Sequence, residues 1–112
     1  MPSQAENVSL HETVEEAVHR IVTAIHPERI VLFGSAARGD THPGSDIDLL
    51  VVVQDGMDRL ATAQGLYHTM RGLPSATDIV VAWCSDIASY GDNPNLVFHT
   101  ALTEGKEVYR AA

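Results

Sequence analysis

The sequence predicts an α+β fold: a mixed β-sheet of three to four strands with helices packed mainly on one face. Three observations support this. Helical and strand periodicities alternate in the order α, β, β, α, β, α, with a short final β. The first two strands are joined by about a dozen turn-rich residues, too few for a helical crossover, which predicts an antiparallel pair. The 112 residues, 45% of them hydrophobic, suit one domain (1–112) with one core.

The first helix is predicted over residues 10–25. Ser9 and Glu12 have capping-box spacing, and apolar residues then recur every three or four positions. The helix is expected to end at His26, because the following proline disfavours helical backbone in the residue before it. Residues 1–8 are polar and are expected to be frayed.

The remaining elements follow from apolar runs and turn residues. Residues 29–33 and 46–53 are read as buried strands, and residues 77–83 as a third. A helix is expected from about Met57 to Arg71, with Leu60, Ala63, Tyr67 and Met70 on its core face. The C-terminal part is expected to hold a short helical stretch from Ser85, a helix over 94–104 capped by Gly105, and a short edge strand over 107–109.

Charge and cysteine content exclude several classes of protein. Seven Lys and Arg against 15 Asp and Glu give a net charge of −8, which argues against a general nucleic-acid binder. No apolar run approaches the roughly 18 residues of a membrane span, and the N-terminus lacks the pattern of a secretory signal. The single cysteine, Cys84, excludes an internal disulfide and suits a reducing compartment, so a cytoplasmic location is expected.

Two aspartates stand where the second strand begins. Asp46 and Asp48 share one face because side chains alternate along a strand, and they lie roughly 6–7 Å apart along it. Carboxylates so placed can lean together onto divalent metal ions. An isolated D-x-D pair is more often a solvated strand end, so the preceding loop decides between these interpretations.

That loop begins with Gly34 and Ser35 directly after a strand. The glycine permits close backbone approach to a ligand, and exposed amides with a hydroxyl suit a phosphate oxygen. A helical turn starting at residues 36–38 would add a favourable field for an anion. Chance gives G-S-x10-D-x-D in about one chain per thousand of this length. Asp78, near the start of the third strand, is a candidate third carboxylate; its alternative is a strand-start acid that caps a turn.

Residues 33–40 (FGSAARGD) and 45–51 (SDIDLLV) resemble the signature of the DNA polymerase beta-like nucleotidyltransferase superfamily. The short chain is similar to its minimal nucleotidyltransferase (MNT) branch, often the antitoxin partner of HEPN ribonuclease toxins. The resemblance implies that Asp46 and Asp48 ligate two Mg²⁺, and that Asp78 completes the triad and activates the acceptor hydroxyl. It implies that Gly34 and Ser35 hold the outer phosphates of ATP. Arg38 matches the motif's arginine and either faces phosphate or braces the loop.

The resemblance implies a nucleotidyltransferase that moves AMP from ATP to a tyrosine hydroxyl of a HEPN toxin, with which it forms a hetero-oligomer. No motif position is substituted, which favours retained activity. The alternative is a non-catalytic antitoxin that neutralises the toxin by binding alone. Nucleotide addition to RNA or a small molecule is disfavoured by the acidic charge, and neither nucleic-acid nor membrane binding is expected.

A few further residues could belong to a site or to the core. His42 lies in the Gly-rich loop and either approaches the ligand or is solvated. Trp83 is interpreted as core or interface, with adenine stacking as the alternative. Cys84 is expected to be a buried packing residue.

Overall fold

The computed structural model describes residues 9–39, 46–89 and 96–112. The expected fraying of residues 1–8 and the role of His42 lie outside these ranges. Within them, no helix has the length and apolar character that a membrane span requires. The expectation of one domain over residues 1–112 stays a prediction.

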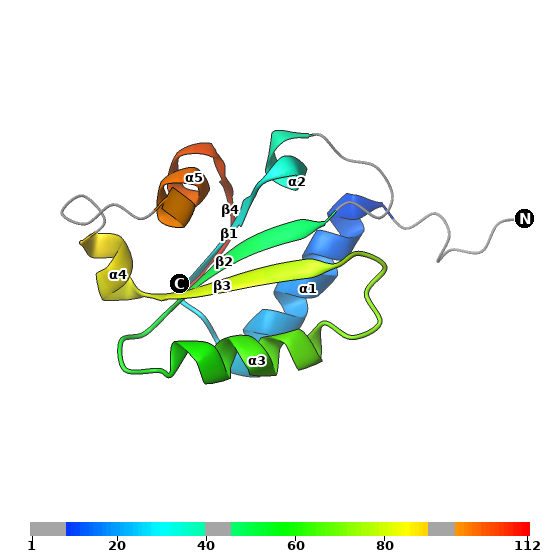
Figure 1. The fold of residues 1–112 in the computed structure, drawn as a ribbon. Coiled ribbons are helices and arrows are strands. Elements are labelled where there is room, and N and C mark those ends of the chain that lie inside the picture. The colour runs from blue at the N-terminus through cyan, green and yellow to red at the C-terminus, as the bar shows by residue number, and fades with distance from the viewer. Residues whose placement is uncertain (1–8, 40–45, 90–95) are drawn as a thin grey trace, which may run out of the picture.

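The described elements match the predicted ones closely (Figure 1). In chain order they are α1 (Leu10–Ile25), β1 (Arg29–Phe33), α2 (Ser35–Arg38), β2 (Ile47–Val53), α3 (Arg59–Thr69), β3 (Thr77–Trp83), α4 (Cys84–Ala88), α5 (Leu96–Glu104) and β4 (Lys106–Arg110). The bounds of α1, β1 and β3 are those predicted. The final strand is longer than expected. The helical turn considered for residues 36–38 is present as α2.

The four strands form one mixed sheet in the order β3-β2-β1-β4. Strand β1 pairs antiparallel with β2 and with β4, whereas β2 and β3 are parallel. The antiparallel pairing of β1 and β2 confirms the prediction from their short connection. The parallel pair is joined through α3, which supplies the crossover that such a pair needs.

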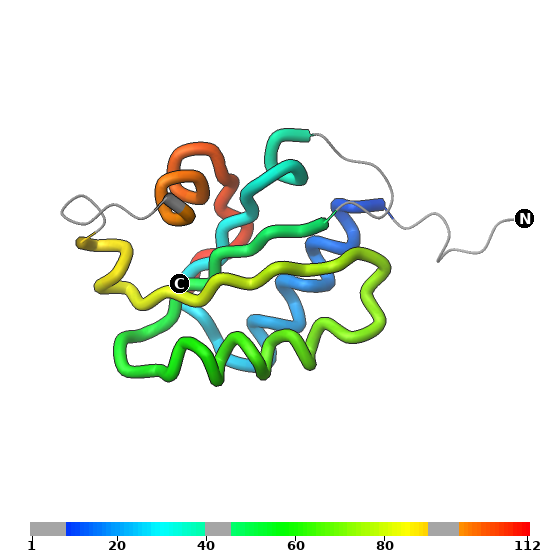
Figure 2. Tube along the Cα trace, in the orientation of Figure 1, coloured from blue at the N-terminus to red at the C-terminus, as the bar shows by residue number. Residues whose placement is uncertain are grey.

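Helices lie on both faces of this sheet, with the two longest on one face (Figures 1 and 2). Helices α1 and α3 cover the face built from Ile30, Leu32, Leu49, Val51 and Ile79, among others. A smaller cluster on the other face joins Val31, Leu50, Val52 and Ala82 to Ala101 of α5. This arrangement confirms the α+β class and the unequal covering of the two faces.

Local chemistry sets the ends of α1. The Ser9 hydroxyl accepts a hydrogen bond from the Glu12 backbone N–H at 3.1 Å, which is one half of the expected capping box. His26 ends the helix in a left-handed conformation with φ 50°, and Pro27 follows. The predicted end is therefore confirmed.

The predicted core face of α3 is wrong in two positions. Leu60 is 68% exposed and Tyr67 is 45% exposed, whereas Leu66 and Met70 are buried. The Tyr67 hydroxyl accepts a hydrogen bond from the Ile79 backbone N–H at 3.0 Å. This polar contact with the edge strand β3 holds the tyrosine at the surface, and the apolar side of the helix is centred on Leu66 instead.

Trp83 and Cys84 occupy the junction of β3 and α4. The Trp83 indole donates a hydrogen bond to the Met57 carbonyl at 2.7 Å, and the Arg59 guanidinium stacks on its ring at 3.8 Å. Trp83 stands five residues beyond Asp78, about 16 Å along the strand. These contacts support the packing interpretation and oppose adenine stacking. Cys84 is exposed, so the expectation of burial is wrong: it begins α4, where the chain leaves the sheet.

Gly105 joins α5 to β4 where backbone packs against backbone. It follows the helix end as expected, but its φ is not left-handed. A Cβ at Gly105 would collide with the Ala101 and Leu32 carbonyl oxygens and a Val31 methyl group. Close approach, and not helix-end geometry, is therefore what requires glycine.

We expect Gly105→Ala to lower the free energy of unfolding by roughly 1–3 kcal/mol, because the surrounding carbonyl groups cannot move aside cheaply. Gly65→Ala is the control: no atom lies within 4 Å of a Cβ there, and the alanine should stabilise α3 by up to about 1 kcal/mol. Urea unfolding measures both changes. A neutral Gly105→Ala would contradict the tight packing.

Candidate active site

Two aspartates lie side by side at one end of the sheet. In the parallel pairing of β2 with β3, Asp48 is in register with Asp78, and on its other side Asp48 faces Phe33 of β1. Residues in register share a face, so the two carboxylates are direct neighbours on the face that α5 partly covers. The sequence suggested this neighbourhood only conditionally, and the register confirms it.

The row behind these aspartates is apolar. Val80, Leu50 and Val31 occupy the next positions on the same face and belong to the smaller core cluster. Burial of these side chains holds β2 in place, so the acidic end of the strand has a fixed position at the rim of the core. Phe33 was not identified from the sequence as part of this site. The alternation of side chains along β1 could have identified it: Ile30 and Leu32 face the larger core cluster, so Phe33 must face the opposite side of the sheet, where Asp48 lies.

Asp46 precedes the first residue of β2 and is exposed. Alternation along the strand places it on the same face as Asp48. Its negative charge contributes to raising the pKa of Asp48. All three predicted acids are therefore close enough to affect one group, with Asp48 at the centre.

Gly34 packs directly against Asp48. It has φ 74° and ψ −156°, a backbone region that is essentially restricted to glycine. A Cβ at this position would overlap a carboxylate oxygen of Asp48. The chain then enters α2 at Ser35, and the Arg38 N–H donates to the Gly34 carbonyl at 3.2 Å. The loop backbone and the acidic pair thus form one contiguous surface.

The environment of Asp48 disfavours its charged form. Burial is the largest cause of a raised pKa, followed by the charge and the hydrogen bond of Asp78 and the charge of Asp46. The positive charge of Arg38 acts in the opposite direction and lowers that pKa. Arg38 therefore acts electrostatically on the acidic pair, a position compatible with both roles considered for it.

The donor atoms suit a hard divalent cation. Carboxylate oxygens are the ligands that Mg²⁺ prefers, and a cation would relieve the repulsion that raises the Asp48 pKa. Among residues 9–39, 46–89 and 96–112, no three His, Cys, Asp or Glu side chains converge as ready metal ligands. Asp78 and Asp46 are exposed and can change rotamer, so the residues fit such an ion without being fully convergent.

The sequence profile of the nucleotidyltransferase domain family matches residues 11–101, which span α1 to α5 and include the acidic end of the sheet. The chain belongs to this family. The prediction of a nucleotidyltransferase is thereby confirmed. No curated protein matched the chain significantly.

Solved structures agree with this assignment. A toxin–antitoxin crystallised with AMP-PNP is 27% identical over 87% of this chain and 73% of that chain, with a TM-score of 0.56. A mutant of the toxin–antitoxin MntA-HpeT is 27% identical over 87% and 72%, with a TM-score of 0.54. A protein described as a nucleotidyltransferase from Sulfolobus solfataricus is 20% identical over 98% and 90%, with a TM-score of 0.60, and shows the shared fold.

We expect Asp48→Asn to stabilise the metal-free nucleotidyltransferase at neutral pH by up to about 1 kcal/mol, because it removes a cross-strand repulsion. The folded-state pKa of Asp48 is raised, so its contribution to stability is full below the unfolded-state pKa and is lost as pH rises through the folded-state pKa. The advantage of the variant should therefore grow from pH 3 to pH 7 in thermal unfolding.

Asp78→Asn supplies the control for that experiment. In the double variant, the second substitution should add less than it does alone, because the repulsion is already gone. Full additivity, or an advantage that shrinks with rising pH, would contradict the coupling.

We expect Gly34→Ala to destabilise the protein by roughly 1–3 kcal/mol, because it forces a side chain into a glycine-only backbone region and onto the Asp48 carboxylate. Gly39→Ala is the matched control, since it also has positive φ (83°) but no atom within 4 Å of a Cβ. Denaturant unfolding should show the larger loss at Gly34. Equal losses would mean that backbone strain alone accounts for both.

Proposed function

We propose that this nucleotidyltransferase transfers AMP from ATP to a hydroxyl group of a partner toxin and so acts as the antitoxin of a toxin–antitoxin pair. The observation that carries the proposal is the register of Asp48 with Asp78, with Gly34 packed against the same carboxylate. Acids for cation binding and a glycine-serine bend for phosphate are thereby adjacent. The likeness to toxin–antitoxin structures, one of them crystallised with AMP-PNP, supports the choice of partner and nucleotide.

Asp46, Asp48 and Asp78 are the residues that would hold two Mg²⁺ ions. When bound, these ions supply charge neutralisation for the triphosphate and a lower pKa for the acceptor hydroxyl. The raised pKa of Asp48 supports this role, because a group that is destabilised when charged gains most from a cation.

The remaining steps belong to the protein's own residues. The Gly34 backbone and the Ser35 hydroxyl bind the outer phosphates, and Arg38 adds positive charge beside them. Asp78 is exposed on the edge strand β3, so an acceptor from another protein can reach it. It takes the proton as the acceptor oxygen attacks the α-phosphorus and the bond to pyrophosphate breaks.

We further propose that the acceptor is a tyrosine of a HEPN ribonuclease toxin in a cytoplasmic hetero-oligomer. The support is the resemblance of residues 33–40 and 45–51 to the MNT branch. A non-catalytic antitoxin is the second candidate. The observation in its favour is that the described acids do not converge as ready metal ligands.

The test is label transfer from α-labelled ATP, with Mg²⁺, to the purified protein encoded by the neighbouring gene. Asp46→Asn and Asp48→Asn should each reduce the transfer rate by about 10²–10³-fold, the loss typical of one electrostatic contact to the transition state. Glu12→Gln is the control, since this exposed carboxylate lies on α1 across the sheet. Absence of transfer, with equal toxin neutralisation by wild type and both variants, would select the binding-only antitoxin.

A further inference from the structure

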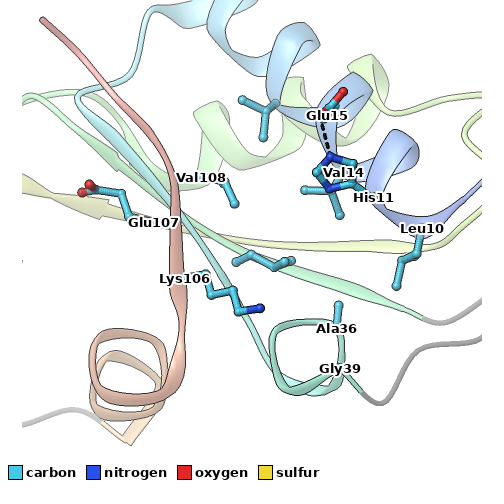
Figure 3. Close-up of a pocket in the computed structure, with 11 residues that line it drawn as sticks. Leu10, His11, Val14, Glu15, Ala36, Gly39, Lys106, Glu107 and Val108 are labelled. Carbon is cyan, nitrogen blue, oxygen red and sulfur yellow. Dashed lines mark ion pairs between the residues drawn. The ribbon is translucent and has the colours of Figure 1, made fainter.

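The helical layer on the larger core face stops short of the β4 edge. A groove of about 680 Å³ lies there, between α1, α2 and β4 (Figure 3). Helix α1 contacts α3 on its other side, and within the part of the chain that the structure describes no helix packs extensively on β4. The groove therefore lies where a third helix of this layer would pack.

The floor of the groove is apolar. It is formed by Leu10, Val14, Val18, Leu32, Ala36 and Val108. The three residues from α1 are spaced four apart, so they form one ridge along the helix, of the kind that packs into the groove of a neighbouring helix. Val14 and Leu32 are nearly buried, whereas Leu10, Val18 and Val108 remain partly exposed.

The two rims differ in charge. On the β4 side, the Lys106 side chain extends over the groove, and it forms no ion pair with any residue that the structure describes (Figure 3). Glu107 points away, because Arg29 at 2.6 Å and Arg110 at 2.7 Å hold its carboxylate. On the α1 side, Glu15 lies on the rim and is paired with His11 at 2.7 Å.

We propose that this groove binds an amphipathic helix of the partner protein, an inference that rests on the proposed function for the identity of that partner. The helix has an apolar stripe at spacing of three and four residues. A carboxylate on one flank meets Lys106, and basic residues on the other flank face the acidic α1. Its packing beside α1 completes the layer of helices on this face.

Charge selects this occupant over two others. A second copy of the chain carries the same net charge of −8 and would place acidic α1 surfaces near one another. A strand added to the edge of β4 would meet the charged side chains Lys106, Glu107 and Arg110 of that strand, a feature that protects sheet edges from pairing.

The groove and the acidic site lie on opposite faces of β1. Leu32 faces the groove, whereas Phe33, the next residue, lies in the row of Asp48 and Asp78. A helix bound in the groove therefore leaves the aspartates open to nucleotide. Substitutions in the groove should therefore weaken partner binding without altering the acidic site, and substitutions of the aspartates should do the reverse.

The test measures the affinity of the neighbouring-gene protein by titration calorimetry. Lys106→Glu and Leu10→Ser should each weaken binding by about tenfold or more, the effect of a central interface contact. Arg71→Glu makes the same charge change outside the groove, and Leu60→Ser removes an equally large exposed apolar side chain from α3. Both controls should stay within about threefold of wild type, and circular dichroism checks that all four variants are folded.

Equal partner affinity of the groove variants and the controls would overturn the inference. So would a wild-type chain that does not bind the partner. A wild-type dimer that Leu10→Ser dissociates would also overturn it, because the groove would then bind a second copy of the chain. A second outcome separates the two proposals. If the wild-type chain binds the partner but transfers no AMP to it, and the groove variants lose that binding, the docking inference stands and the proposed AMP transfer fails. Transfer abolished by Asp48→Asn with unchanged partner affinity supports the separation of the two surfaces.

Discussion

Repulsion between two carboxylates on adjacent strands is the constraint on which the site depends. Asp48 and Asp78 are held in register by the parallel pairing of β2 with β3, and partial burial removes some of the water that would screen them. A fold built only for stability gains nothing from this arrangement. A divalent cation shared by the two carboxylates would offset that repulsion, and this is why the proposed function assigns Mg²⁺ to this place.

The surrounding structure is organised to keep that pair in position. Leu50 and Val52, further along the same face of β2, are buried with α5, so the strand cannot slip without exposing them. Gly34 lets the loop backbone lie against Asp48, and α2 begins at once. The bend at Gly34 and Ser35 and the acids therefore lie together at one corner of the sheet.

The acidic site and the apolar groove lie on opposite faces of the sheet. The acidic row lies on the face that carries the smaller core, and the apolar groove lies on the face covered by α1 and α3. Because β1 separates them, the proposed partner helix would bind on one side of this strand while the proposed acceptor residue approaches the other.

Local sequence determined most of the secondary structure and part of the site. The capping residues and periodicity of α1, the strand at residues 77–83 and the acids at the start of β2 were readable because each depends on neighbours in the chain. Only tertiary structure decided that β3 lies parallel beside β2, which puts Asp78 opposite Asp48. It also decided that Tyr67 faces the surface and that a Cβ at Gly34 would strike Asp48. These features depend on contacts between distant segments, which periodicity within one segment does not encode.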